Sequence, residues 1–152
     1  AERSPVVAAK LPLVTEALRW VGHLPTRSRG TVGGSIAHAD PSAELPAMFL
    51  ALGGEAVAVG AGGWRTIAAD DFFQSFFTTA LEPTELLVEV RFPAMPAGAG
   101  HAVEEFARRK GDFAIVGIAA IVTKDGSRAR DVRLVAVGAS GTPLRLRAAE
   151  QS

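Results

Sequence analysis

The sequence predicts an α+β chain in two parts, residues 1–97 and 98–152. Apolar residues at helical spacing gather near the N-terminus, whereas alternating apolar and polar residues, typical of strands, dominate the rest. Short turns join several of the predicted strands and indicate hairpins. The stretch Pro93–Gly100 is rich in proline, alanine and glycine, which is typical of a linker between the two parts.

Two helices are predicted in the first part. Residues 12–21 carry apolar side chains at helical spacing, with Pro12 suited to the first turn and Gly22 suited to ending the helix. Residues 43–52 are rich in alanine, leucine and methionine and stop at two glycines. Residues 23–30 mix turn formers with two arginines, so we expect a loop there.

Strands are predicted in both parts. Residues 55–60 and 64–67 should form a hairpin, and residues 86–92 a third strand. Phenylalanines crowd a short helix or turn between them, where we expect core packing more often than a cofactor or subunit contact; they are Phe72, Phe73, Phe76 and Phe77. The second part should contain strands at residues 102–107, 115–123 and 132–138 and the first turns of a helix at residues 144–151.

Composition limits the possible functions. Sixteen basic and sixteen acidic residues give a formal charge of zero, so no global field attracts nucleic acid or anionic lipid. The chain has no cysteine, which excludes disulfides, thiolate zinc sites and an iron–sulfur cluster held by this chain itself. The longest apolar run, residues 113–122, is too short to span a bilayer, and no signal peptide is evident. We therefore expect a soluble, cytoplasmic protein without nucleic-acid or integral membrane contacts.

The most informative segment surrounds Gly33 and Gly34. Two glycines can adopt positive φ and let a ligand approach backbone N–H groups closely, as a pyrophosphate cradle requires. Thr31 and Ser35 add hydroxyl donors, and Asp40-Pro41 resembles the N-cap and first-turn proline of a helix pointing at the anion. From the residues alone, a turn without a nucleotide is the commoner structure. The pattern matches neither the G-x-G-x-x-G nor the P-loop signature.

Other candidate chemistry has less support. His38 and Asp40 could begin a metal site, but the other two histidines are far away in sequence, and we expect no metal. His38 is expected to orient the loop or approach a cofactor. Asp70 and Asp71 are adjacent and point in different directions, so we expect a solvated pair. No G-x-S-x-G elbow is present, and no side chain is expected to be catalytic.

Residues 29–46, RGTVGGSIAHADPSAELP, resemble the second FAD motif of the medium subunit of aerobic carbon monoxide dehydrogenases, a motif shared with the xanthine dehydrogenase family. The resemblance continues through residues 76–87 and 106–116. It implies a PCMH-type, vanillyl-alcohol-oxidase-like FAD-binding fold, with residues 1–97 as its second subdomain. Residues 98–152 would begin the antiparallel α+β C-terminal domain of the flavoprotein subunit. The family's first FAD motif, an A-G-G-x-S-type turn, belongs to an earlier subdomain, so we expect half of the cradle here.

The resemblance also implies which residues bind FAD. In the family, the T-[IV]-G-G-[NS] turn contacts the diphosphate, while an acidic residue after the Asp-Pro step and a leucine in a later strand approach the cofactor. A loop of the C-terminal domain lies near the flavin. The implied binding residues are Thr31, Val32, Gly33, Gly34, Ser35, Ala39, Asp40, Glu44, Leu87, Lys110, Gly111 and Asp112. For the adjoining Arg108 and Arg109, surface charge and a role near the flavin or a partner subunit are equally open.

The implied function is that of the FAD-binding electron-transfer subunit of a molybdenum hydroxylase. In such an enzyme a molybdopterin-containing large subunit oxidises the substrate and an iron–sulfur small subunit relays electrons. FAD collects the electrons and passes them to an external acceptor. The alternative is a non-catalytic docking fragment that keeps the fold and the subunit interfaces but does not bind flavin alone.

Overall fold

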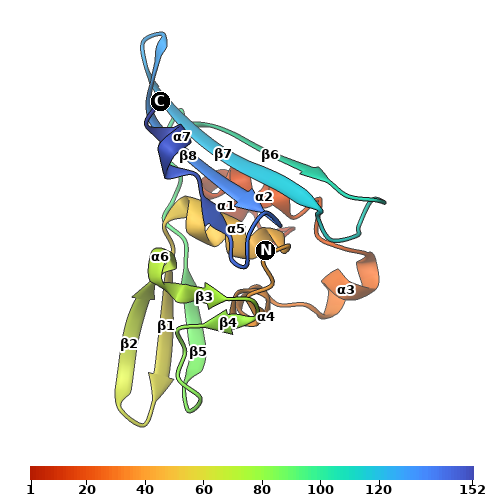
Figure 1. Ribbon diagram of the computed structural model, residues 1–152, viewed down its shortest axis with the longest axis vertical. Coiled ribbons are helices and arrows are strands. Elements are labelled where there is room, and N and C mark those ends of the chain that lie inside the picture. Colours follow the sequence, from red (N-terminus) through yellow and green to blue (C-terminus); the bar gives the residue numbers. More distant parts are fainter.

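The computed structural model describes residues 1–152 as an α+β structure, with helices gathered between two sheets at opposite ends (Figure 1). The helices are α1 (Pro5–Lys10), α2 (Pro12–Ala17), α3 (Leu24–Arg29), α4 (Val32–His38), α5 (Glu44–Leu52), α6 (Ala69–Phe72) and α7 (Arg147–Glu150). The strands are β1 (Glu55–Gly60), β2 (Gly63–Ala68), β3 (Phe73–Ser75), β4 (Thr78–Thr79), β5 (Leu86–Arg91), β6 (Gly100–Phe106), β7 (Val116–Asp125), β8 (Arg128–Val137) and β9 (Leu144–Arg145).

The N-terminal helices are shorter and more numerous than the sequence predicts. The helix predicted over residues 12–21 ends at Ala17, and turns follow it. The loop predicted over residues 23–30 is wrong, because α3 occupies most of it. His23 is the extended residue before α3, and Pro25 lies in its first turn. Proline indicates a loop in many sequences, but the first turn of a helix accepts it because no N–H is needed there.

The segment around Gly33 and Gly34 is helical, which corrects the predicted glycine turn. Both glycines lie inside α4, and neither has positive φ. Thr31 is the N-cap, since its Oγ1 accepts a hydrogen bond from the Gly34 N–H at 2.9 Å. This bond satisfies one of the free N–H groups of the first turn and favours a helix start over a turn. Left-handed backbone occurs instead at Ala39, which ends α4 with φ 55°.

Helix α5 forms the buried centre of the molecule, and every one of its residues is buried. It begins at Glu44, so the prediction that Asp40-Pro41 caps and opens this helix is wrong. Asp40 instead closes an Asx turn, because its Oδ1 accepts a hydrogen bond from the Ser42 N–H at 2.9 Å. The helix ends at Gly53 with φ 66°, which confirms the predicted glycine stop.

Two of the three antiparallel sheets confirm most of the predicted strands, and the third is the short pair β3-β4. The first has the order β2-β1-β5 and the second the order β6-β7-β8-β9, and both predicted hairpins are present. The helix predicted over residues 144–151 is mostly wrong, because Leu144 and Arg145 pair with the edge of β8 and leave only α7 beyond them. Among the phenylalanines, Phe72 is buried, whereas Phe76 and Phe77 are exposed against the expected core role.

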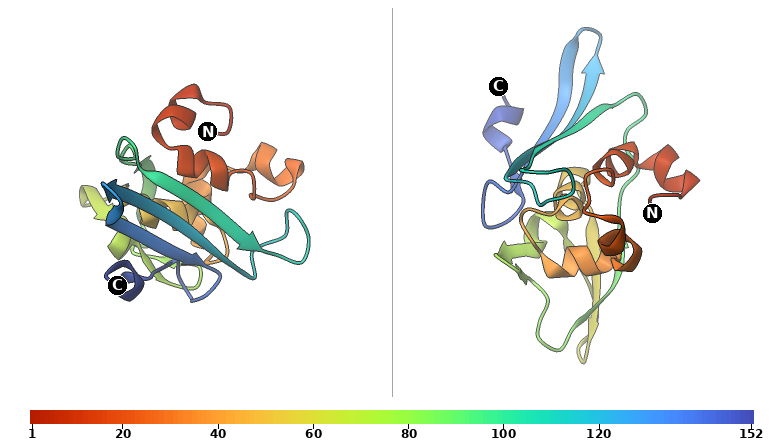
Figure 2. Two further views of the ribbon diagram at one scale, coloured as in Figure 1. Left: turned by 90° about the horizontal axis from the view of Figure 1, so that it is seen from above. Right: turned by 90° about the vertical axis from the view of Figure 1, so that its right-hand side faces the viewer.

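One hydrophobic core joins both parts of the sequence. Helices α2 and α5 contact the second sheet, and Figure 2 shows α1 and α2 on one side of this sheet and α7 on the other. Phe49 of α5 makes edge-to-face contacts with Phe72 and Phe92 at ring distances of 5.9 and 5.7 Å. Val103 and Val135 of the second sheet belong to the same buried cluster. The linker therefore connects two parts that share a core.

Gly54 follows α5 at a point where the core has no room for a side chain. A Cβ there would overlap the Phe49 ring and lie 2.9 Å from the Arg91 carbonyl oxygen. Gly54→Ala is expected to lower the free energy of unfolding by about 2 kcal/mol, measured by urea denaturation. The control is Gly62→Ala in the β1–β2 turn, where a Cβ would meet no atom within 4 Å. Similar losses in the two variants would contradict this account of the core.

Candidate functional site

The start of α4 presents an accessible backbone. Val32 and Gly33 open the helix, so their N–H groups have no earlier carbonyl of the same helix to bind. A Cβ at Gly33 would meet no atom within 4 Å, whereas one at Gly34 would lie 2.7 Å from the Thr31 Oγ1. Gly34 thus makes room for the cap, and Gly33 leaves open space beside two free donors. This arrangement fits the diphosphate of a nucleotide cofactor.

The turn after α4 is joined to the C-terminal sheet. The Pro41 carbonyl accepts a hydrogen bond from the N–H of Gly138, just beyond β8, at 2.9 Å. Gly138 has φ 70°, and a Cβ there would lie 2.8 Å from the carbonyl oxygen of Ile115, just before β7. Three segments distant in sequence therefore meet beside the first turn of α5.

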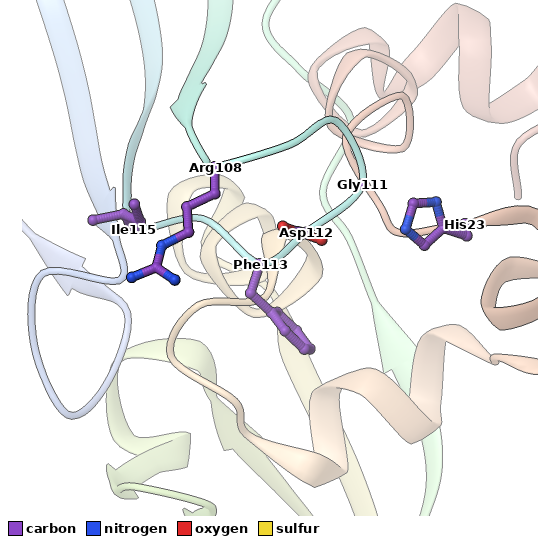
Figure 3. Close-up of a pocket in the computed structure, with 6 residues that line it drawn as sticks. All are labelled: His23, Arg108, Gly111, Asp112, Phe113 and Ile115. Carbon is purple, nitrogen blue, oxygen red and sulfur yellow. The ribbon is translucent and has the colours of Figure 1, made fainter.

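A cavity of about 570 Å³ lies beside the loop between β6 and β7 (Figure 3). Its lining residues are His23, Arg108, Gly111, Asp112, Phe113 and Ile115. Figure 3 shows the Phe113 ring projecting from the loop and the His23 ring beside the loop at Gly111. The cavity thus combines two aromatic rings with both signs of charge.

His23 and Gly111 fit closely together. Gly111 has φ 93°, and a Cβ there would lie 2.7 Å from the His23 Cε1. Glycine at this position therefore lets the imidazole approach the loop backbone. Sequence reasoning selected Gly111 but missed His23, because nothing in the pattern around His23 indicates a contact with the β6–β7 loop.

The predicted site residues lie in three places. Thr31 to Ser35 form the start of α4, Asp40 and Glu44 flank the turn before α5, and Gly111 and Asp112 line the cavity. The structure does not place Lys110 in the cavity lining, where Arg108 lies instead. Leu87 is half-buried in β5 and packs against the core, and Ala39 is buried at the end of α4.

The remaining polar candidates have structural partners. The His38 ring lies 5.0 Å from the ring of Phe77, at the end of α4. No group of three or more potential ligands is arranged to hold a metal ion. Asp70 is exposed, and its Oδ1 lies 2.7 Å from the guanidinium Nη2 of Arg147 in α7.

No helix has the length and apolar character needed to cross a membrane.

Two carboxyl groups, one in α5 and one in β6, have raised pKa values. Burial is the main cause of the raised pKa of Glu44, which is 5% exposed, and the charge of Asp40 adds to it. Burial also raises the pKa of Glu105 to about 7, with a further contribution from the charge of Glu44. Sequence reasoning missed Glu105, although strand alternation from Val103 places it on the inner face of β6.

Comparisons with known proteins agree with this geometry. Residues 1–95 match the family described as the FAD binding domain in molybdopterin dehydrogenase, and residues 101–152 match the CO dehydrogenase flavoprotein C-terminal domain. Subunit alpha of the 6-hydroxypseudooxynicotine dehydrogenase complex of Paenarthrobacter nicotinovorans is 42% identical over 97% of this chain and 50% of its own length. The carbon monoxide dehydrogenase medium chain of Hydrogenophaga pseudoflava is 39% identical over 93% of this chain and 50% of its own length.

A solved structure gives the same result. A chain of the Hydrogenophaga pseudoflava carbon monoxide dehydrogenase that lacks the Mo-pyranopterin moiety superposes with a TM-score of 0.94. It is 41% identical over 97% of this chain and 52% of that chain. The present chain thus spans about half the length of the relatives it matches. The predicted flavoprotein fold and the resemblance are confirmed, and the chain belongs to the family of FAD-binding domains of molybdopterin dehydrogenases.

Proposed function

We propose that this chain is part of the electron-transfer subunit of a molybdenum hydroxylase, with residues 1–97 as the second FAD subdomain and residues 98–152 within the C-terminal domain. Its partners would be an iron–sulfur subunit and a molybdopterin-containing large subunit. The open backbone at Gly33, in a family that binds FAD, carries the proposal. The names of two relatives, a complex subunit and a medium chain, support a hetero-oligomer.

The start of α4 would hold the FAD diphosphate. The free N–H groups of Val32 and Gly33 can donate to phosphate oxygens, and the positive end of the helix dipole favours the anion. The Thr31 Oγ1 accepts a hydrogen bond from the N–H of Gly34, so its own O–H remains available as a donor. Ser35 adds a second hydroxyl on the same helix.

Residues farther along the chain would hold the rest of the cofactor. The Glu44 carboxyl is buried. The one hydrogen bond that affects its pKa comes from its own backbone. Hydroxyl groups of the cofactor can therefore supply further donors to this carboxyl. Gly111 and Asp112 line a cavity whose volume suits an aromatic ring system, and Lys110 adjoins them in the same loop. Strand β5 contacts α4, which keeps Leu87 near the cradle, while Asp40 and Ala39 shape the turn beside it.

The chain itself would bind and orient the cofactor, and FAD when bound supplies the redox chemistry. Backbone donors, hydroxyls and a cavity are sufficient for this work. No side chain needs to act as an acid or a base towards the oxidised substrate, because that reaction belongs to the large subunit in this proposal.

Reconstitution with FAD tests the proposal. The chain is incubated with FAD alone, and in parallel with FAD and a chain that carries the A-G-G-x-S turn, and unbound FAD is removed by gel filtration. We expect absorbance in the flavin bands to accompany the protein, at least in the second sample. Protein without flavin in both samples would refute FAD binding and support the non-catalytic docking fragment.

A further inference from the structure

The tip of the loop between β6 and β7 is exposed except at Gly111. Residues 108–110 and 112–113 are exposed, whereas Gly111 is half-buried. The base of the loop is fixed, because the Ile115 N–H donates a hydrogen bond to the Phe106 carbonyl at 2.8 Å. The neighbouring Ala114 belongs to the buried core. Gly111 is therefore the point where the tip meets the body of the protein.

The group that covers Gly111 is the imidazole of His23. A Cβ at Gly111 would lie 2.7 Å from the His23 Cε1, 2.8 Å from its Nδ1 and 3.3 Å from its Nε2. Figure 3 shows this ring next to the loop at Gly111. The ring thus occupies the place that any side chain at position 111 would take. The backbone also favours glycine there, since its φ is 93°.

Helix α3 holds the backbone of His23. The His23 carbonyl accepts hydrogen bonds from the N–H groups of Thr26 and Arg27 at 2.9 and 3.0 Å. Gly30 is the C-cap of α3, and the next residue, Thr31, is the N-cap of α4. One short helix therefore joins the residue that meets the loop tip to the residue that begins the proposed diphosphate cradle.

We propose that His23 is a positioning residue for FAD, which holds the tip of the β6–β7 loop beside the cavity by packing against Gly111. This inference rests on the proposed FAD-binding function. The start of α4 would hold the diphosphate, and the cavity that His23 and the loop line would receive the isoalloxazine. A loop that is held in place before binding saves the free energy of ordering it when the ligand arrives.

Two replacements of His23 test the packing. His23→Ala removes the ring, so the tip loses its contact and FAD affinity should fall about tenfold. His23→Phe keeps a flat ring against Gly111 and should retain affinity close to the wild-type value. Both are measured by FAD titration of the full chain, with the partner supplying the A-G-G-x-S turn. Wild-type affinity in His23→Ala, or an equal loss in His23→Phe, would overturn the proposal.

Binding of ADP separates positioning of the loop from a general loss of structure. ADP carries the diphosphate without the isoalloxazine, so it occupies the cradle and leaves the cavity empty. His23→Ala should therefore weaken FAD binding and leave ADP affinity unchanged. The control His101→Ala removes an imidazole that faces Glu16 of α2, and it should change neither affinity. An equal fall for FAD and ADP in His23→Ala would contradict a role through the loop.

A measurement without FAD keeps the two proposals distinguishable. Nitrogen-15 NMR relaxation follows the order parameters of the Gly111 and Asp112 amides in the full chain. His23→Ala should lower these order parameters, whereas His101→Ala should not. Unchanged values in His23→Ala overturn the role of His23 even if FAD binds. Lower values in a chain that binds no FAD, even with the partner, confirm the contact but refute the proposed function and the role of His23 in it.

Discussion

Replacing Gly33 with valine is expected to lower FAD affinity at least about a hundredfold, because the branched side chain covers the free N–H groups at the start of α4. The free energy of unfolding should change by no more than about 1 kcal/mol. An added Cβ meets no atom within 4 Å, and the backbone there does not have positive φ. Affinity is measured by FAD titration of the reconstituted complex, and stability by urea denaturation.

The neighbouring glycine provides a matched control. A Cβ at Gly34 would lie 2.7 Å from the Thr31 Oγ1, so Gly34→Ala should disturb the cap and cost about 1 kcal/mol of stability. Gly33→Val, in contrast, should leave the free energy of unfolding nearly unchanged and lower FAD affinity. If Gly33→Val instead loses stability and retains affinity, the start of α4 is a structural feature and the diphosphate binds elsewhere.

The FAD-free chain is expected to lose about 3 kcal/mol of unfolding free energy as pH rises from about 4.5 to about 7, through Glu105 alone. Burial raises the pKa of Glu105 from 4.5 to about 7, so the folded chain keeps a proton that the unfolded chain releases. The stabilising contribution is therefore complete below pH 4.5 and is lost as pH rises through the folded pKa. The raised pKa of Glu44 acts in the same direction.

Urea denaturation at a series of pH values measures this dependence. Glu105→Gln should remove most of the decline between about pH 4.5 and 7. Glu85 affects the free energy of unfolding in a lower pH range than Glu105. The hydrogen bond from Arg65 lowers the pKa of Glu85 to about 2, so its contribution is lost as pH falls from 4.5 towards 2. Parallel pH curves for the wild type and Glu105→Gln would show that Glu105 does not ionise as described.

Local patterns predicted the strands and α5 because alternation and a glycine stop depend on neighbours in sequence. They failed where one hydrogen bond decides the structure. The Thr31 hydroxyl turns the two glycines into a helix start, and the Asp40 carboxylate forms an Asx turn where a helix cap is predicted. Propensity alone does not distinguish these outcomes, because glycine, threonine and aspartate favour turns and helix starts alike.

The candidate site was predictable only in part for a related reason. Thr31, Gly33 and Gly111 lie in motifs that can be recognised from neighbouring residues. His23 matters because it fits against Gly111, which lies far from it in sequence. Glu105 matters because burial raises its pKa, and the charge of the distant Glu44 adds to this shift. Alternation along β6 does place a carboxyl on an apolar face, and this signal alone could have drawn attention to Glu105.

The shared core has a consequence for how the chain folds. Phe49 and its neighbours in α5 are covered by residues from both sides of the linker. Neither part can bury its apolar surface without the other. The cooperative folding unit is therefore larger than the segment that either family model matches. Folding should therefore be a single all-or-none transition, and cleavage within the linker should leave two complementary pieces that remain associated.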